Sequence, residues 1–113
     1  MTGPAPSGTA VVVCSVSELE SQGRVIAVVE GIEVVVSWND GNPGALTNSC
    51  IHRGRKLSEG FVLKGRLVCP GHQWSFDTVD GYCKERDRYQ PAHRVDIVDS
   101  EVQVRISAEV NAG

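Results

Sequence analysis

Two short segments of the chain each place one cysteine close to one histidine. They are Cys50-Ile51-His52 and Cys69-Pro70-Gly71-His72, and 16 residues separate them. Thiolate and imidazole are strong protein ligands for soft and borderline metal ions. A length of 113 residues fits one domain, and a chain this short cannot bury both a sizeable core and a deep substrate cavity. We therefore expect a small domain built around a metal centre.

The composition favours an all-β fold. Valine outnumbers leucine by 18 to 5, and β-branched side chains suit a pleated sheet better than a helix. The pattern predicts strands over residues 10–15, 24–30, 32–38 and 45–48, with a helical turn at 16–19 and a turn cluster at 39–44. A second hairpin with one buried face is expected from residues 94–98 and 101–106, because apolar and polar residues alternate there.

The middle of the chain has a different sequence pattern. Regular periodicity fades between residues 50 and 81, where glycine recurs at positions 54, 60, 65, 71 and 81. We expect a β-sandwich or barrel base with a loop-rich subdomain inserted at about residues 48–82, which would hold the metal centre. Residues 10–108 would form the single domain, with a flexible tail at 1–9 and a frayed end at 109–113. The mixed-charge run at 84–89 is interpreted as a solvated loop.

The cysteines indicate metal or redox chemistry more than disulfide bonding. The polar start of the chain resembles no signal peptide, and no apolar run is long enough for a membrane helix. We expect a cytoplasmic protein, in which disulfides are rare. Cys14 lies in an apolar strand and is expected to be a buried small hydrophobe. A Cys14–Cys83 disulfide is the less favoured alternative, and His93 is expected at the surface or in packing.

Two kinds of metal centre fit two cysteines and two histidines. A structural zinc site normally groups its cysteines in one knuckle and its histidines in one helical turn. Here the two residue types are interleaved, and Pro70-Gly71 opposes a helix. The interleaving favours a two-iron, two-sulfide cluster in which two cysteines bind one iron and two histidines bind the other.

The two segments resemble the Rieske motif of oxygenases and ferredoxins. The resemblance extends beyond the four candidate ligands Cys50, His52, Cys69 and His72. It covers about 32 residues, comprising Cys50-Ile51-His52-Arg53-Gly54, Leu57-Ser58-Glu59-Gly60, Cys69-Pro70-Gly71-His72-Gln73-Trp74-Ser75-Phe76-Asp77 and Gly81. It implies the Rieske iron–sulfur fold, one [2Fe-2S] cluster per chain and one-electron transfer, with the histidine-bound iron nearer to solvent.

The ligand set also bears on the reduction potential. Two thiolates and two neutral imidazoles leave the oxidised cluster about neutral, which raises its potential above that of an all-cysteine cluster. High-potential Rieske proteins carry a disulfide between the two loops, and its cysteines would fall at Arg55 and Gly71. They also carry a serine at the position of Trp74. Because this chain lacks these features, we expect the low end of the Rieske range, near about −150 mV.

The charge is unevenly distributed along the sequence. Between the two ligand segments lie five basic residues and one acidic residue, a formal charge of +4, which leaves −7 on the rest of a chain whose total is −3. The basic residues are Arg53, Arg55, Lys56, Lys64 and Arg66. A solvated surface and a docking rim for an acidic partner are both open interpretations. Nucleic acid is disfavoured, because no stacking aromatic residues are interleaved with the charges.

The resemblance implies an electron carrier rather than an enzyme. After the four cluster ligands only His93 is left, so the chain cannot build the two-histidine, one-carboxylate iron site of an oxygenase. We expect a monomeric ferredoxin between an NAD(P)H-dependent reductase and a terminal aromatic-ring-hydroxylating oxygenase. The alternatives are a small subunit of NADH-dependent nitrite reductase, a Rieske domain of an oxygenase large subunit, and a structural zinc-binding module. The Met1 start favours a complete small protein over the oxygenase domain.

Overall fold

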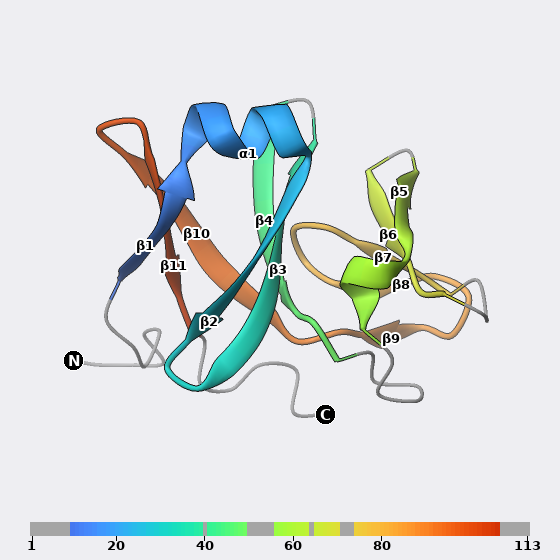
Figure 1. Cartoon of the computed structure of the whole chain (residues 1–113). Coiled ribbons are helices and arrows are strands. Elements are labelled where there is room, and N and C mark those ends of the chain that lie inside the picture. Colours follow the sequence, from blue (N-terminus) through green and yellow to red (C-terminus); the bar gives the residue numbers. More distant parts are fainter. Residues whose placement is uncertain (1–9, 40, 50–55, 64, 71–73, 107–113) are drawn as a thin grey trace.

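The computed structural model describes residues 10–39, 41–49, 56–63, 65–70 and 74–106. Two lobes are visible in Figure 1, and β3 and β4 lie on the side of the larger lobe that faces the smaller one. The larger lobe contains β1 (Val11–Ser15), α1 (Val16–Gln22), β2 (Arg24–Val29), β3 (Ile32–Asn39), β4 (Asn42–Thr47), β10 (Ala92–Val98) and β11 (Glu101–Arg105). The small lobe contains η1 (Leu57–Glu59), β5 (Phe61–Leu63), β6 (Arg66–Val68), β7 (Ser75–Asp77), β8 (Tyr82–Cys83) and β9 (Arg88–Tyr89).

The larger lobe is a six-stranded antiparallel sheet in the order β1-β11-β10-β4-β3-β2, called here the base sheet. Helix α1 connects the two edge strands and lies across the open end of the curled sheet (Figure 1). Its limits follow from local chemistry. The Ser15 hydroxyl accepts a hydrogen bond from the Glu18 N–H, and Gly23, with φ of 82°, donates its N–H to the Leu19 carbonyl. The predicted all-β class is confirmed, although this helix is longer than the single turn expected.

Strand β3 separates two hydrophobic cores. Val34 and Val36 belong to the core inside the base sheet, whereas Val35 belongs to the core beneath the small lobe. All three are completely buried, because successive side chains of a strand point to opposite faces and both faces are covered here. The uninterrupted valine run in the sequence is explained by this position.

Two hairpins were correctly placed from the sequence. The turn between β2 and β3 uses Glu30 and Gly31, and that between β10 and β11 uses Asp99 and Ser100, all four with positive φ. The expectation of one buried face fails at the end of β10. Ile97 is 44% exposed, although Val102, its direct partner across the hairpin, is completely buried.

The turn cluster predicted at residues 39–44 is shorter than expected. Asn42, Pro43 and Gly44 form the start of β4, paired with the end of β3. Proline is tolerated there because β4 pairs with β10 only at Ala45 and Leu46, so Pro43 needs no ladder partner on that side. The middle of the chain also contains more regular structure than its irregular pattern suggests, since β5, β6 and β7 form a three-stranded antiparallel sheet.

No helix among the described residues is long and apolar enough to cross a membrane.

Candidate metal centre

Of the four predicted ligands, one is described by the structure. Cys69 follows β6, is 1% exposed and forms no disulfide. Cys50, His52 and His72 lie outside the described residues. Within the described part of the chain no three histidine, cysteine or acidic side chains come together as a metal site. The structure therefore bears on the predicted centre through the residues that flank the first ligand segment (residues 50–55) and the second (residues 69–73).

The residues on both sides of the first ligand segment are joined to each other. Ser49 and Lys56 form an antiparallel β-bridge, and the Leu57 N–H donates to the Asn48 carbonyl at 2.7 Å. The Asn48 side chain, itself completely buried, accepts from the Ser58 N–H at 2.8 Å and donates to the Ser58 hydroxyl at 3.0 Å. The entry to this segment, residues 47–49, and its exit, residues 56–58, are thus held side by side.

Two further polar side chains, those of Gln90 and His93, form hydrogen bonds with the same entry. The Gln90 side-chain amide donates to the carbonyls of Thr47 and Ser49, at 2.6 and 2.8 Å. The hydroxyl of Thr47 lies 2.8 Å from Nε2 of His93, which agrees with the predicted packing role of this histidine. Burial lowers the pKa of His93.

The second ligand segment leaves and re-enters one small sheet. The Cys69 N–H donates to the Trp74 carbonyl at 2.8 Å, and the neighbouring Val68 and Ser75 are paired across β6 and β7. Cys69 packs in the same core as Leu57, which follows the first ligand segment. The two predicted ligand segments therefore begin and end on a common core.

Ser75 is tied to two charged side chains immediately after the second segment. Its hydroxyl accepts from Nε of Arg66 at 3.0 Å and donates to the Glu85 carboxylate at 3.0 Å, and its N–H donates to the same carboxylate at 3.3 Å. Arg66 also donates to the Tyr82 carbonyl at 2.8 Å. From the sequence, Arg66 is one of the basic residues of a possible docking rim. In the structure its guanidinium donates hydrogen bonds to Ser75 and Tyr82 within the small lobe.

Two ionisable groups near Ser75, Glu85 and Cys83, have shifted pKa values. Burial would raise the pKa of Glu85, but hydrogen bonds from its own N–H and from Ser75 more than offset this, so the pKa lies below its usual value. Burial raises the pKa of the Cys83 thiol, whose sulfur donates to the Glu85 carboxylate at 3.4 Å. Cys83 is a buried core residue. Cys14 and Cys83 are both free and lie in different cores, so the alternative disulfide is absent.

Trp74 combines packing with a cationic partner. It packs at the edge of the small-lobe core, while Phe76 is completely buried inside it. The Arg86 guanidinium lies 5.1 Å from the centre of the indole ring, a cation–π distance. The run 84–89, predicted as a solvated loop, is exposed throughout; residues 84–87 form the turn of the β8–β9 hairpin, and 88–89 form β9.

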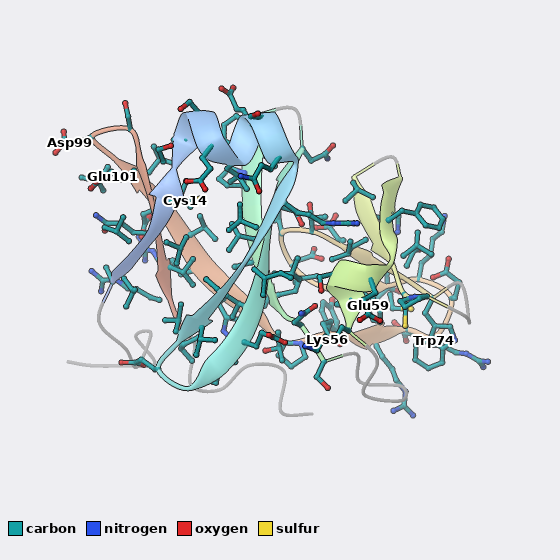
Figure 2. All side chains as sticks on the ribbon, viewed as in Figure 1. Cys14, Lys56, Glu59, Trp74, Asp99 and Glu101 are labelled. Atoms are coloured by element: carbon teal, nitrogen blue, oxygen red, sulfur yellow. The ribbon has the colours of Figure 1, made fainter. Side chains whose placement is uncertain are left out.

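The small lobe carries described charges of both signs. Figure 2 shows Lys56 and Glu59 at the small lobe, and Asp99 and Glu101 at the far end of the base sheet. Lys56 pairs with Glu33 at 3.5 Å, and both side chains are well exposed, so this pair adds little stability. Arg53, Arg55 and Lys64 lie outside the described residues, and the docking rim stays a prediction.

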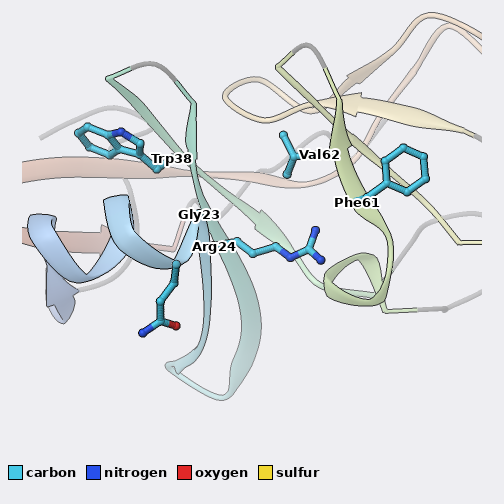
Figure 3. Close-up of a pocket in the computed structure, with 6 residues that line it drawn as sticks. Gly23, Arg24, Trp38, Phe61 and Val62 are labelled. Carbon is cyan, nitrogen blue, oxygen red and sulfur yellow. The ribbon is translucent and has the colours of Figure 1, made fainter.

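A groove of about 280 Å³ separates the two lobes (Figure 3). Arg24 reaches from the start of β2 across it and donates to the Gly60 carbonyl at 2.8 Å, which joins the base sheet to the small lobe. The other lining side chains are Gln22, Trp38, Phe61 and Val62. This lining offers neither a metal ligand of the Cys or His type nor a nucleophile, so the groove is distinct from the candidate centre.

The donor set fits a [2Fe-2S] cluster. A reduced, buried cysteine stands at the start of the second ligand segment, and thiolates are the ligands that such clusters require. Paired strands and buried polar side chains fix the flanks of both segments on one core, which suits a group bound from two sides. The sequence predicts four candidate ligands but gives no sign of Asn48, Ser75, Glu85 and Gln90, because their partners are distant in sequence or are backbone groups.

Comparison with known proteins agrees with this fit. The family model described as "Rieske [2Fe-2S] domain" matches residues 9–103. Chlorophyllide a oxygenase of Arabidopsis thaliana is 44% identical over 52 residues, which is 46% of this chain and 10% of that protein. The ferredoxin component of the naphthalene 1,2-dioxygenase system of Pseudomonas aeruginosa is 36% identical over 61 residues, 53% of this chain and 59% of that protein.

The fold is shared with a solved ferredoxin. The ferredoxin of carbazole 1,9a-dioxygenase from Nocardioides aromaticivorans IC177 superposes with a TM-score of 0.77 at 25% identity, covering 87% of this chain and 98% of that one. The match to the chlorophyllide a oxygenase spans only about a tenth of that longer protein. The same domain thus occurs both as a ferredoxin and as part of larger oxygenases.

Proposed function

The chain belongs to the Rieske [2Fe-2S] domain family, and from this premise we propose that it is a one-electron carrier of a multicomponent oxygenase system. It takes electrons from an NAD(P)H-dependent reductase and passes them to a terminal aromatic-ring-hydroxylating oxygenase. It acts as a cytoplasmic monomer. The similarity to the ferredoxin component of the naphthalene 1,2-dioxygenase system supports this assignment.

Cys50, His52, Cys69 and His72 would hold the cluster. Such a cluster supplies reversible one-electron chemistry at a potential set by its ligands and by hydrogen bonds to its sulfurs. The observation that carries this assignment is the core shared by Leu57, which follows the first ligand segment, and by Cys69, which is not in a disulfide. The chain's own part is to hold the two pairs of ligands apart and to keep the cysteine side in the apolar core.

The carrier role is favoured over an oxygenase role by the supply of ligands. The chain has three histidines, and His93 is buried on β10 beside Thr47. An oxygenase iron site of the common type needs two histidines and a carboxylate with open positions. The residues left after cluster binding cannot provide it, so the oxidation of a substrate would take place on another polypeptide or domain.

The first test is spectroscopic. Purified protein should be red-brown, contain two irons per chain and give a rhombic EPR signal when reduced. Cys69→Ser should abolish that signal, whereas Cys14→Ala, which alters a buried cysteine of the base sheet, should retain it. A colourless protein that contains zinc would overturn the cluster assignment and leave the zinc-binding module as the alternative.

The second test concerns the partners. The reduced protein is mixed with candidate reductase and oxygenase components, and product formation from NADH is measured with and without it. Turnover that depends on the protein supports the carrier role. Turnover without an added oxygenase would show that the chain has its own catalytic site. Activity only with a nitrite reductase large subunit would favour that alternative.

A further inference from the structure

Gln90 is a completely buried polar residue between β9 and β10, far from both ligand segments in sequence. We propose that Gln90 is a positioning residue that fixes the spacing of the two ligand segments and thereby tunes the cluster. This inference rests on the ligand assignment of the proposed function. It concerns how the cluster is held rather than which residues bind it.

The side chain of Gln90 holds the entry to the first ligand segment. Its Nε2 atom donates to the Thr47 carbonyl at 2.6 Å and to the Ser49 carbonyl at 2.8 Å. A primary amide has two N–H donors, and both are directed at this short stretch of backbone. Ser49 directly precedes Cys50, so the amide fixes the peptide from which the first predicted ligand extends.

The backbone of Gln90 holds the region that follows the second ligand segment. Its N–H donates to the Gly81 carbonyl at 2.8 Å, and the Gly81 N–H donates to the Asp77 carbonyl at 2.9 Å. Asp77 ends β7, the strand that begins directly after Trp74. One residue therefore connects the entry of the first segment to the strand that leaves the second.

The contact with Gly81 leaves Gln90 little freedom to move. Gly81 has φ of 79°, and a Cβ atom at this position would lie 2.2 Å from the Gln90 carbonyl oxygen. Only glycine meets both conditions. The backbone of Gln90 is thus held against Gly81 while its side-chain amide is bonded to Thr47 and Ser49, so a change in the side chain would shift the entry of the first ligand segment.

The chemistry of the side chain identifies glutamine as the required residue. Glutamate has the same shape but, when ionised, offers only acceptors to two carbonyl oxygens. Asparagine keeps the donors on a side chain one methylene shorter, which cannot span the same distance. Residues that orient ligands from outside the first coordination sphere typically change metal affinity by about 10-fold to 100-fold when they are replaced.

The experiment compares holoprotein containing Gln90→Glu or Gln90→Asn with wild type and with Gln103→Glu. Gln103 is a half-buried glutamine on β11 of the base sheet and serves as the matched control. The readouts are the g-values of the reduced EPR signal, the midpoint potential, and the rate of iron loss to a chelator. We expect both Gln90 variants to shift the g-values and the potential and to lose iron about 10-fold faster, while Gln103→Glu matches wild type.

The outcomes separate this inference from the proposed function. A wild-type protein with no Rieske signal defeats the ligand assignment before any variant is made. Wild-type g-values and potential in the Gln90 variants, with at most a lower melting temperature, would show a purely structural role and overturn the inference alone. If Gln90→Glu gives no folded holoprotein, the milder Gln90→Asn decides between these results.

Discussion

His93 shows how one histidine is kept out of metal binding. It lies on β10 with 6% of its surface exposed, and its Nε2 atom faces the Thr47 hydroxyl at 2.8 Å. Burial lowers its pKa because the charged imidazolium loses hydration that the fold does not replace. The imidazole is therefore neutral in the folded protein over a wider pH range than in the unfolded chain.

This pKa shift predicts a loss of stability in mild acid. Below about pH 6.5 the unfolded chain binds a proton at His93 that the folded chain does not bind, so the free energy of unfolding falls as the pH falls toward the lowered folded value. His93→Gln should lack this contribution. Its slope of stability against pH should be smaller than that of wild type by up to about 1.4 kcal/mol per pH unit.

Thermal unfolding of both holoproteins between about pH 5.5 and 7.5 measures the difference. The comparison cancels the other two histidines, which are present in both proteins. Parallel curves for wild type and His93→Gln would contradict the prediction.

Trp74 bears on the potential of the cluster. It stands two residues after His72, where the high-potential proteins of the family have a serine hydroxyl, and its ring is covered by Arg86. This chain lacks that serine hydroxyl as a donor to sulfide, so more electron density is expected to stay on the cluster. We expect a midpoint near about −150 mV by redox titration. A midpoint above about 0 mV would contradict this expectation.

At the scale of single residues, the sequence predicts the candidate metal ligands better than the residues that hold them in place. Cys69 and its three predicted co-ligands stand out because thiolate and imidazole occur in a recognisable spacing. Asn48 and Gln90 give no such signal, since each acts on backbone groups or on residues brought near by the fold. When the hydrogen-bond partner of a buried polar residue is distant in sequence, the residues next to it in the chain do not distinguish it from an exposed polar residue.

Among the elements, β4 connects the two lobes. Its Gly44 packs so closely against the turn after β7 that a Cβ atom would lie 1.7 Å from the Thr78 carbonyl oxygen. The backbones of the base sheet and the small lobe meet here with no space for a side chain. The requirement for glycine at this position comes from packing, since its φ is not positive.

Gly44→Ala should therefore destabilise the holoprotein strongly. The backbone oxygen of Thr78 must move by more than an ångström, and we expect a loss of about 3 kcal/mol together with weaker cluster retention. The matched control is Gly41→Asn in the turn just before β4. Gly41 has φ of 85° and nothing within 4 Å of an added Cβ, and asparagine tolerates this conformation, so the loss should stay below about 1 kcal/mol.

Thermal or denaturant unfolding measures both losses. Equal stability of the two variants would show that the lobes can separate at Gly44 without cost.

The strands themselves were predictable where periodicity and turn residues agree. The β2–β3 hairpin carries continuous apolar runs and the β10–β11 hairpin carries alternating apolar residues, in each case on either side of turn residues with positive φ. The start of β4 was missed, because Asn42-Pro43-Gly44 has the composition of a turn although it pairs with β3. Strands of two or three residues, such as β7 and β8, are too short to show a period at all.

The division of the whole chain into a tail at 1–9, a domain at 10–108 and a frayed end at 109–113 stays a prediction. The described acidic side chains Asp99 and Glu101 lie at the end of the base sheet away from the small lobe (Figure 2). Lys56, at the exit of the first ligand segment, lies at the small lobe, as does Glu59. The formal charge of +4 counted from the sequence between the two ligand segments predicts a dipole, which would orient the protein before it meets a partner.

This dipole predicts how electron transfer depends on salt. If an acidic partner face docks at the small lobe, Arg53→Glu or Arg55→Glu should slow electron transfer at low ionic strength by about 10-fold, and salt should affect the variants less than wild type. Arg105→Glu on β11 makes the same charge change on an exposed residue of the base sheet and should have little effect. Stopped-flow oxidation of the reduced protein by the oxygenase, measured across ionic strength, compares the four proteins. Rates independent of salt in wild type, or equal effects of Arg53→Glu and Arg105→Glu, would mean that the basic residues between the ligand segments are an ordinary solvated surface and that docking depends on uncharged contacts.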